Sequence, residues 1–283
     1  MRLLRVGATG RETPAVLDAS GVLLDLRGVV NDIDATFFAE NGPAAVREAV
    51  ETGRLPELDP GLRIGPPVAR PGKVVCVGLN YSDHAEETGA QRPDEPVVFL
   101  KAPYTVVGPH DEVLVPRGSV KTDWEVELAV VIGRTGRYLA DHAAAVDCVA
   151  GYAISNDVSE REFQLERGGQ WDKGKSCETF NPLGPWLVTA DEIPDPQRLG
   201  LRLWVNGELR QNGSTANMIF PVAEVVRYLS QFMVLEPGDV INTGTPAGVA
   251  LGLPDPKPYL RAGDVVEVEI DGLGRQRQEV GSA

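Results

Sequence analysis

Short runs of β-branched and aromatic residues, each closed by Gly, Asn or Asp, recur from residue 73 to the end of the chain. Such runs are typical of strands bounded by turns. They read KVVCVGLN, PVVFLK, VELAVVIG, DCVAGYAISND, RLWVNG, GDVINTG and GDVVEVEIDG. Helical patterns are fewer, namely DHAEETG, SEREFQLERG and FPVAEVVRYLSQF, and they do not alternate regularly with the strands. This order predicts an α+β, mostly β fold built on a mixed, mostly antiparallel sheet or roll.

The first part of the chain has a different pattern. This pattern predicts a small N-terminal α/β domain over residues 1–67, followed by a catalytic domain over 68–283. MRLLRVG and AVLDASGVLLDL resemble short strands, with a turn at Ser20 and Gly21. AAVREAVETG has the pattern of a helix that ends at Gly53. Many prolines between residues 56 and 71 indicate a linker.

Charge, motifs and apolar stretches disfavour several classes of function. The formal net charge is -14, which disfavours binding to nucleic acid and to anionic membranes. Neither a GxGxxG motif nor a P-loop is present, so a nucleotide cofactor has no support. The N-terminus lacks the apolar core of a signal peptide, and no stretch reaches the ~18 apolar residues of a membrane span. Three cysteines without a CxxC pair favour the cytoplasm, and Cys76 lies in an apolar run typical of a buried core.

Two acidic residues interrupt the strand pattern of TDWEVELAVVIG. Glu125 and Glu127 are two positions apart, so their side chains leave the same face of a strand, about 6–7 Å apart. The apolar side chains of Trp124, Val126 and Leu128 take the opposite face. The pattern alone allows a solvated face of a half-exposed strand as readily as a pair of ligands.

A third acid, Asp157, stands where the strand in AISNDVSEREFQ gives way to a helical pattern. Asp157, Arg161 and Gln164 are four and three positions apart, which predicts that they share one helix face. Asp157 is alternatively a helix N-cap, and Arg161 an ordinary surface charge. If Asp157 meets the two glutamates, their repulsion requires protonation or a cation. Ligation by oxygen alone selects Mg2+, Mn2+ or Ca2+ over Zn2+ and leaves positions for water and substrate.

One of the three histidines has an acidic neighbour at helical spacing. His84 and Glu87 are three residues apart in GLNYSDHAEETG, so a helical turn places them on one face. A histidine and a carboxylate that orients its imidazole together form a general-base dyad. The alternative is a lone histidine on a surface loop. His110 and His142 have no such company and are interpreted as structural.

Two lysines and one turn complete the candidates. Lys175, flanked by Gly and Ser in WDKGKSCETF, and Lys101, which ends an apolar strand, are able to present an ammonium group to an anion. TGTP, residues 243–246, offers hydroxyls and backbone N–H groups suited to a carboxylate or an oxyanion. Solvated lysines and an ordinary turn are the alternatives.

Taken together and in order, these segments strongly resemble the fumarylacetoacetate hydrolase family. The matching strings are GLNYSDHAEE, PVVFLKAP, DWEVELAVVIG, GYAISNDVSERE, WDKGKS, GPWLV, VNGELRQNGST, MIF, EPGDVINTGTPAGV and GDVVEVEIDGLG. The resemblance spans residue 73 to the C-terminus. It implies a mixed β-roll catalytic domain, a homodimer and the use of Mg2+ or Mn2+.

The resemblance also implies a role for each candidate. By position in the family's motifs, Glu125, Glu127 and Asp157 match metal ligands, His84 and Glu87 a water-activating dyad, Lys175 a catalytic lysine, and Lys101, Arg161, Gln164 and Thr245 substrate-binding residues. The implied substrate is a small 2-keto or 2,4-diketo acid.

The opening MRLLRVG, together with KTDWEVEL and SEREFQLERGGQWDKGKS, is most similar to the subgroup that hydrolyses 2,4-diketo-3-deoxy sugar acids such as those from L-fuconate or L-rhamnonate, often labelled ureidoglycolate lyase. The implied reaction is hydrolysis of a C–C bond to pyruvate and a carboxylic acid, a step in sugar acid catabolism. Oxaloacetate decarboxylase and ureidoglycolate lyase are rival activities of the same site. A non-catalytic module stapled by Ca2+ is the alternative of a different class.

Overall fold

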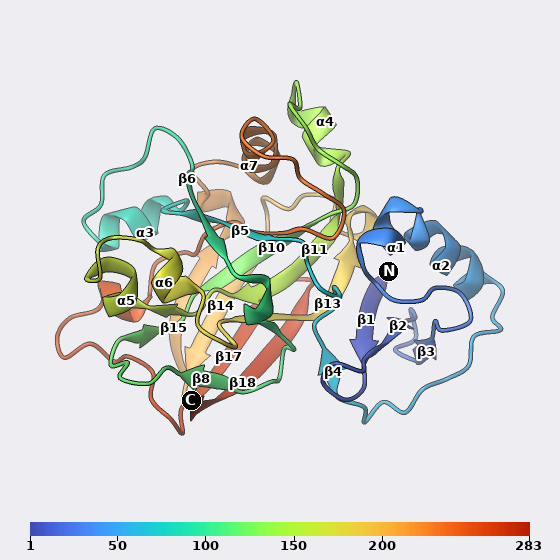
Figure 1. The fold of residues 1–283 in the computed structure, drawn as a ribbon, viewed down its shortest axis with the longest axis horizontal. Coiled ribbons are helices and arrows are strands. Elements are labelled where there is room, and N and C mark those ends of the chain that lie inside the picture. Colours follow the sequence, from blue (N-terminus) through green and yellow to red (C-terminus); the bar gives the residue numbers. More distant parts are fainter.

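Two β-sheets form most of the protein, as a computed structural model of residues 1–283 shows (Figure 1). Nine strands of an eleven-stranded sheet follow the order β3-β2-β1-β13-β11-β10-β16-β5-β6, with β4 beside β1 and β7 beside β13. A five-stranded sheet has the order β15-β14-β17-β18-β8, and β9 pairs with β12. Most neighbours are antiparallel, whereas β16–β5, β13–β7 and β18–β8 are parallel. The predicted mostly β, mixed fold is confirmed.

The strands have the following bounds: β1 Arg2–Val6, β2 Thr13–Leu17, β3 Leu23–Asp25, β4 Ile64–Gly65, β5 Val74–Gly78, β6 Val97–Lys101, β7 Val106–Val107, β8 Val113–Val115, β9 Thr122–Asp123, β10 Val126–Ile132, β11 Val149–Asn156, β12 Ser159–Glu160, β13 Asn181–Thr189, β14 Gly200–Val205, β15 Glu208–Ser214, β16 Val240–Asn242, β17 Val265–Ile270 and β18 Gly274–Ser282. The helices are α1 Ala35–Ala39, α2 Gly42–Glu51, α3 Ser82–Glu87, α4 His142–Val146, α5 Arg161–Leu165, α6 Asp172–Lys175 and α7 Val222–Leu229. Short 3-10 turns lie at Pro103–Thr105, Ala190–Glu192, Thr215–Asn217 and Ala250–Gly252.

Strand β10 contributes to two hydrophobic cores because its side chains alternate between the two faces of the large sheet. The even-numbered residues from Val126 to Ile132 pack with β14 and β17 between the two sheets. Ala129 and Val131 face the opposite way, into a core shared with helices α1 and α2. Every residue of β10 is therefore buried, and any polar side chain on it needs a partner inside the protein.

The N-terminal segment continues the large sheet. Strand β1 pairs with β13 in antiparallel register, and β2 and β3 follow it outward, as the blue end of the ribbon shows (Figure 1). The predicted strands around the turn at Ser20 and Gly21 are present, and α2 is followed by Gly53 at φ +64°, as predicted. No break in the sheet marks residue 67, so the division into two domains stays a prediction.

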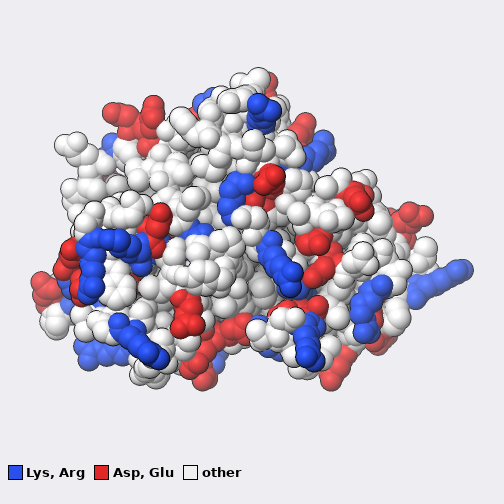
Figure 2. Space-filling view, in the orientation of Figure 1, with Lys and Arg blue, Asp and Glu red and all other residues white.

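None of the helices combines the length and the apolar character that crossing a membrane requires. Acidic and basic side chains intermingle on the face shown in Figure 2. Cys76 is fully buried, as predicted, and all three cysteines are free thiols.

Candidate active site

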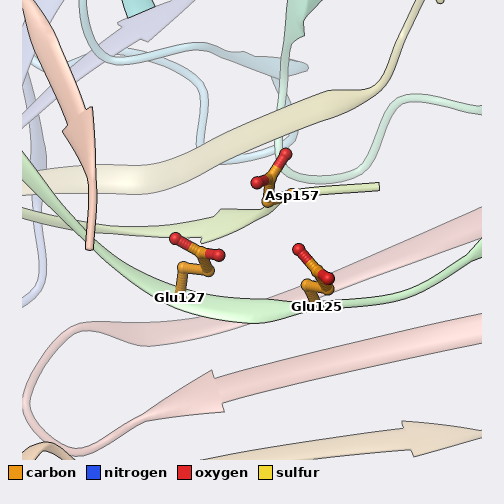
Figure 3. A group of neighbouring side chains, drawn as sticks. All are labelled: Glu125, Glu127 and Asp157. Atoms are coloured by element: carbon orange, nitrogen blue, oxygen red, sulfur yellow. The ribbon is translucent and has the colours of Figure 1, made fainter. Parts of the chain in front are cut away.

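Three carboxylates meet at the point where β10 begins and β11 ends (Figure 3). The two strands are antiparallel, with Val126 opposite Asn156, so this register brings residues 125 and 127 beside residue 157. Ligand oxygens of Glu125, Glu127 and Asp157 lie within 4.8 Å of one another, and the residues are 4 %, 2 % and 0 % exposed. The solvated strand face is therefore excluded, and the predicted meeting of the three acids is confirmed.

The local structure around Asp157 differs from the predicted one. Helix α5 begins only at Arg161, after the short strand β12, so Asp157 lies outside the helix. The N-cap is Glu160, whose carboxylate accepts from the backbone N–H of Phe163 at 2.6 Å. The predicted helix face shared by residues 157, 161 and 164 was thus wrong for Asp157, and so was its alternative as a cap. The pairing of β9 with β12 inserts the extra strand before the helix.

Buried cations surround two of the three carboxylates. The Lys175 ammonium donates to Glu125 Oε2 at 2.6 Å and to Asp157 Oδ2 at 2.8 Å. Lys101 donates to Asp157 Oδ1 and to the carbonyl oxygen of Val158. Both lysines are 2 % exposed, so neither is an ordinary solvated lysine.

Arg161 completes the ring of cations. Its Nη2 donates to Glu125 Oε1 at 2.7 Å, and its Nη1 donates to Gln164 Oε1 at 3.0 Å. Burial alone would raise the pKa of Glu125, but Lys175 and Arg161 outweigh it and lower that pKa to about 2. Glu125 is therefore ionised at neutral pH, and the surface-charge alternative for Arg161 is excluded by its 3 % exposure.

Glu127 is the carboxylate without a cationic partner. Its one hydrogen bond comes from the backbone N–H of Gly244, at 2.7 Å. Burial, followed by repulsion from Asp157 and Glu125, raises the pKa of Glu127 well above its usual range. Negative charge is thus in excess at this corner of the cluster. Carboxylate oxygens alone suit a hard divalent cation, so the residues present fit such an ion.

The TGTP turn forms hydrogen bonds to strand β10. Gly244 adopts φ +97°, and a Cβ there would lie 2.8 Å from Asn80, so only glycine fits. The Thr245 hydroxyl donates to the Val126 carbonyl at 2.9 Å and accepts from Gln211 at 2.8 Å. The turn was predicted to suit a carboxylate or an oxyanion, and in this structure its Gly244 N–H binds the Glu127 carboxylate.

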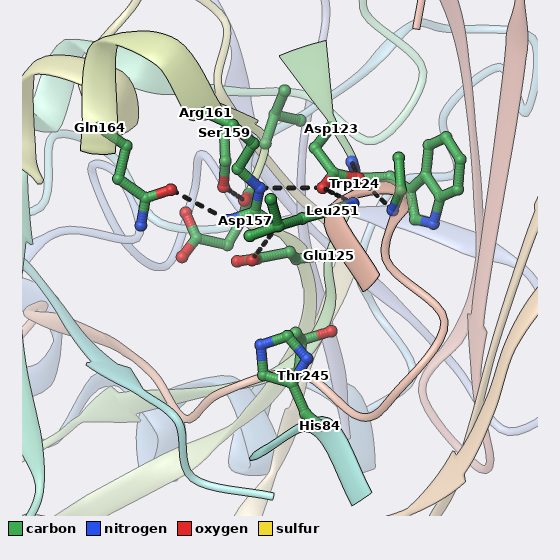
Figure 4. A network of polar contacts seen from close by, with 12 residues as sticks. His84, Asp123, Trp124, Glu125, Asp157, Ser159, Arg161, Gln164, Thr245 and Leu251 are labelled. Carbon is green, nitrogen blue, oxygen red and sulfur yellow. Dashed lines mark hydrogen bonds and ion pairs between the residues drawn. The ribbon is translucent and has the colours of Figure 1, made fainter. Parts of the chain in front are cut away.

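His84 and Glu87 form the predicted pair on α3. His84 Nδ1 lies 2.9 Å from Glu87 Oε1, and the other oxygen of Glu87 accepts from the backbone N–H of Gly248 at 2.8 Å. A carboxylate only accepts, so in the neutral imidazole Nδ1 carries the hydrogen and Nε2 keeps its lone pair. The imidazole lies opposite Glu125 (Figure 4), and both residues line one cavity. The lone surface histidine is excluded, because His84 is 7 % exposed.

A cavity of about 180 Å³ contains most of the predicted site residues. Its lining includes His84, Glu125, Glu127, Arg161, Gln164, Lys175 and Thr245. Glu87, Asp157 and Lys101 are not part of that lining. Glu87 contacts His84, Asp157 contacts Lys175, and Lys101 contacts Asp157. A larger hollow of about 620 Å³ beside the N-terminal segment has charged groups that pair with one another, as Arg5 does with Asp32 at 2.6 Å. We therefore assign the chemistry to the smaller cavity.

Comparison with known proteins shows the family to which this chain belongs. The sequence model described as "Fumarylacetoacetate (FAA) hydrolase C-terminal" matches residues 73–281. The chain belongs to the fumarylacetoacetate hydrolase family. The structure of fumarylacetoacetate hydrolase from the psychrophile Exiguobacterium antarcticum is 37 % identical, with a TM-score of 0.85 and full coverage of both chains. The predicted fold and family are thereby confirmed.

Two further members of the fumarylacetoacetate hydrolase family bear on function. A Burkholderia ambifaria protein, named a hydrolase by inference only, is 53 % identical over 283 residues and covers both chains completely. Maleylpyruvate hydrolase from Sphingobium sp. SYK-6, solved with manganese(II) and pyruvate, is 29 % identical with a TM-score of 0.81, again over both whole chains. Relatives of this chain thus include proteins named hydrolases and proteins named isomerases, and one hydrolase was solved with manganese(II).

Asp123 is a buried residue beside this site that the sequence interpretation missed. Its two oxygens accept from the backbone N–H groups of Ala250 and Leu251, at 2.8 and 3.0 Å, and from Arg161 Nε at 2.8 Å (Figure 4). Asp123 therefore fixes both the guanidinium that contacts Glu125 and the loop that carries Leu251. The signal in the sequence was the extension of the acidic alternation by one step, to residues 123, 125 and 127.

Proposed function

We propose that this protein is a hydrolase that cleaves a C–C bond in a 2,4-diketo acid to give pyruvate and a carboxylic acid. The observation that carries the proposal is the His84–Glu87 pair, because its imidazole lines the same cavity as Glu125 and Glu127. An oriented imidazole with a free Nε2 activates water, and a water nucleophile is what hydrolysis needs. The family and the manganese- and pyruvate-bound structure of its relative support the assignment.

Glu125, Glu127 and Asp157 would hold the cation, Mg2+ or Mn2+. When bound, such an ion supplies Lewis acidity toward the 2-keto acid end of the substrate. Lys101 and Lys175 contact Asp157 and Glu125, so they lock the ligand geometry and balance the charge of the acids. Mg2+ and Mn2+ share the same oxygen preference, and the choice between them belongs to a metal titration.

The side chains of the cavity account for each proton and electron pair. His84 Nε2 removes a proton from water, while Glu87 stabilises the resulting imidazolium. The hydroxide oxygen bonds to C4, the C3–C4 bond breaks, and its electron pair moves to C3 to form the enolate of pyruvate. The His84 imidazolium then gives its proton to C3, which forms pyruvate and returns the imidazole to its neutral state. The positive charges of Lys175 and Arg161 offset the charge of the enolate, and the Gln164 amide is placed to donate to its oxygens.

The finer assignments follow from resemblance. Sequence similarity to the subgroup acting on 2,4-diketo-3-deoxy sugar acids puts these compounds in the first test panel. A homodimer and a cytoplasmic location stay predictions, which gel filtration and fractionation of cells would test.

The test is release of pyruvate from 2,4-diketo acids, oxaloacetate and ureidoglycolate, each with and without Mg2+ or Mn2+. We expect metal-dependent hydrolysis of a diketo acid. His84→Ala should lower kcat for hydrolysis by a factor of about 10²–10⁴, the usual contribution of general base catalysis. His142→Ala, an exposed histidine paired with Glu224, is the matched control and should leave kcat unchanged. Turnover of oxaloacetate alone would contradict the proposal and favour a decarboxylase.

The Ca2+-stapled module is separated from an enzyme by Glu127→Ala. An enzyme should stay folded and lose metal-dependent turnover. A structural staple should instead lose thermal stability in the presence of the metal, and should show no turnover before the substitution. Retention of both properties would exclude a metal at this cluster.

A further inference from the structure

The active-site cavity has two chemically different halves. Its floor carries the charged and catalytic groups described above. Its outer half is lined by apolar side chains that, apart from Phe99, are partly exposed and that come from six separate segments. We name them the apolar wall: Leu79, Ala90, Phe99, Leu165, Trp171 and Leu251. The floor binds the 2-keto acid end in the proposed function, so the outer half is what remains for the rest of the substrate.

Two aromatic rings form the centre of the apolar wall and are held in place by packing. Phe99 on β6 and Trp171 before α6 meet edge to face, with ring centroids 5.4 Å apart. The end of β5 leaves room for them, because a Cβ on Gly78 would lie only 2.5 Å from the Trp171 ring. The Lys175 ammonium lies 4.9 Å from the centre of the Phe99 ring. The aromatic surface therefore starts directly beside the charged floor.

Leu165 extends the apolar wall to the mouth of the cavity. It follows Gln164 on α5 and is 44 % exposed, although Leu is a residue whose burial stabilises proteins. A ligand that covers this leucine would remove its exposed apolar surface from water, which favours binding of the ligand.

Hydrogen-bonding groups are scarce in the outer half. Thr88 is its one polar side chain apart from the floor residues, and the Thr88 hydroxyl donates to the His84 carbonyl at 2.9 Å. Each hydroxyl of a polyhydroxylated chain would lose its water here without receiving a protein partner. An apolar chain would lose only unfavourable contact with water.

We propose that the apolar wall is the subsite for the acyl group and that the natural substrate carries an apolar acyl group rather than a polyhydroxylated one. This inference rests on the proposed function for the position of the 2-keto acid end. It assigns specificity to Trp171 and Leu165, neither of which the reaction itself requires.

The first measurement compares three substrates of the wild-type enzyme with Mn2+: 2,4-dioxopentanoate, 2,4-dioxoheptanoate and a 2,4-diketo-3-deoxy sugar acid. We expect kcat/KM to rise about fourfold per added methylene, which is roughly 16-fold from the methyl to the propyl compound. The sugar acid should be the poorest of the three. A sugar acid preferred over 2,4-dioxoheptanoate would overturn the inference and leave the proposed function intact.

Two variants locate the effect. Trp171→Ala and Leu165→Ser should each reduce the ratio of kcat/KM for the propyl to that for the methyl substrate, mainly through KM. Leu165 is already half exposed, so its variant should fold normally. Leu209→Ser, at a leucine of 48 % exposure that does not line the cavity, is the matched control and should leave the ratio unchanged. An unchanged ratio in both wall variants would contradict the assignment.

Binding separates this inference from the proposed function. Pyruvate, 2-oxoheptanoate and a 2-keto-3-deoxy sugar acid cannot undergo the diketo cleavage, so calorimetry with Mn2+ measures their affinity alone. Tighter binding of 2-oxoheptanoate than of pyruvate supports the apolar subsite even if no diketo acid is hydrolysed. Equal affinity, or tightest binding of the sugar acid, overturns it whatever the reaction proves to be.

Discussion

Asp123 shows how one buried side chain organises an active site without entering its cavity. Its carboxylate is fully buried and accepts from Arg161 and from two backbone N–H groups of the loop at residues 250–252. Asp123→Asn keeps the shape but removes the charge opposite Arg161. We expect a loss of unfolding free energy of about 3 kcal/mol, the usual cost of breaking a buried ion pair on one side. Urea denaturation would measure it.

The control for this prediction is the same substitution at a surface pair. Asp271 accepts from Arg202, and half of the Asp271 side chain is exposed. Asp271→Asn should therefore cost less than about 1 kcal/mol. Similar losses of unfolding free energy in the two variants would mean that the buried ion pair stabilises the fold no more than the exposed one. A loss of kcat/KM on Asp123→Asn, with KM changed more than kcat, would further indicate that Arg161 acts on substrate binding.

At the scale of single residues, the sequence allowed the same-face pair Glu125 and Glu127 to be predicted, since the period of a strand is local. Asp157 was suggested by the end of a strand pattern and its role as a ligand by resemblance, whereas its predicted place on a helix was wrong. Its true position depends on the register between β10 and β11, which is set by contacts distant in sequence. The same is true of the partners of Lys101 and Arg161.

Strands β11 and β13 pass each other so closely that one position tolerates no side chain. A Cβ on Gly151 would lie 2.1 Å from the carbonyl oxygen of Val188. Gly151→Ala must push the two strands apart, and we expect it to cost more than about 2 kcal/mol of unfolding free energy. Gly28→Ala is the control, because nothing lies within 4 Å of a Cβ there. Equal thermal midpoints for the two variants would refute the steric argument.

Helices α4 and α7 are joined by a charged group that responds to acid. Arg227 hydrogen-bonds to Glu224 and, with His142, holds the pKa of Glu224 at about 2. A depressed carboxylate pKa stabilises the fold above the ordinary value of 4.5, and the contribution disappears as pH falls from there through 2.

We therefore expect wild type to be more stable than Glu224→Gln at pH 5, by less than about 1 kcal/mol since the group is partly exposed. The difference should shrink toward zero at pH 2. Thermal unfolding of both proteins across this range measures it. A difference that grew on acidification would have the wrong sign for this mechanism.

Over the whole molecule, the mostly β class was predictable because β-branched runs and turn residues are local signals. The sheet order was not, since strands such as β16 and β5 pair across more than 160 residues, with Val240 opposite Val74. The position of the N-terminal segment also escaped prediction. Its composition suggested a separate unit, while its first strand pairs with β13 of the large sheet.

From that pairing we expect residues 1–67 to fold together with the rest of the chain rather than as an independent domain. The core on the outer face of the large sheet draws seven of its seventeen residues from this segment, namely Leu3, Val16, Leu26, Ile33, Phe37, Phe38 and Val46. A chain of residues 68–283 alone would expose the remaining ten and the edge of β13, so we expect it to aggregate.

Calorimetry of the full chain gives the sharper test. Two parts that share one core should unfold in a single transition, and Phe37→Ala should lower that transition as a whole by about 3–5 kcal/mol of unfolding free energy. An independent N-terminal domain would instead give a separate transition, and Phe37→Ala would shift only that one. If the transition is single, Phe37→Ala should also lower the temperature at which the active-site cavity is lost. The reason is that β13 is the direct sheet neighbour of β11, and Asp157 follows the end of β11.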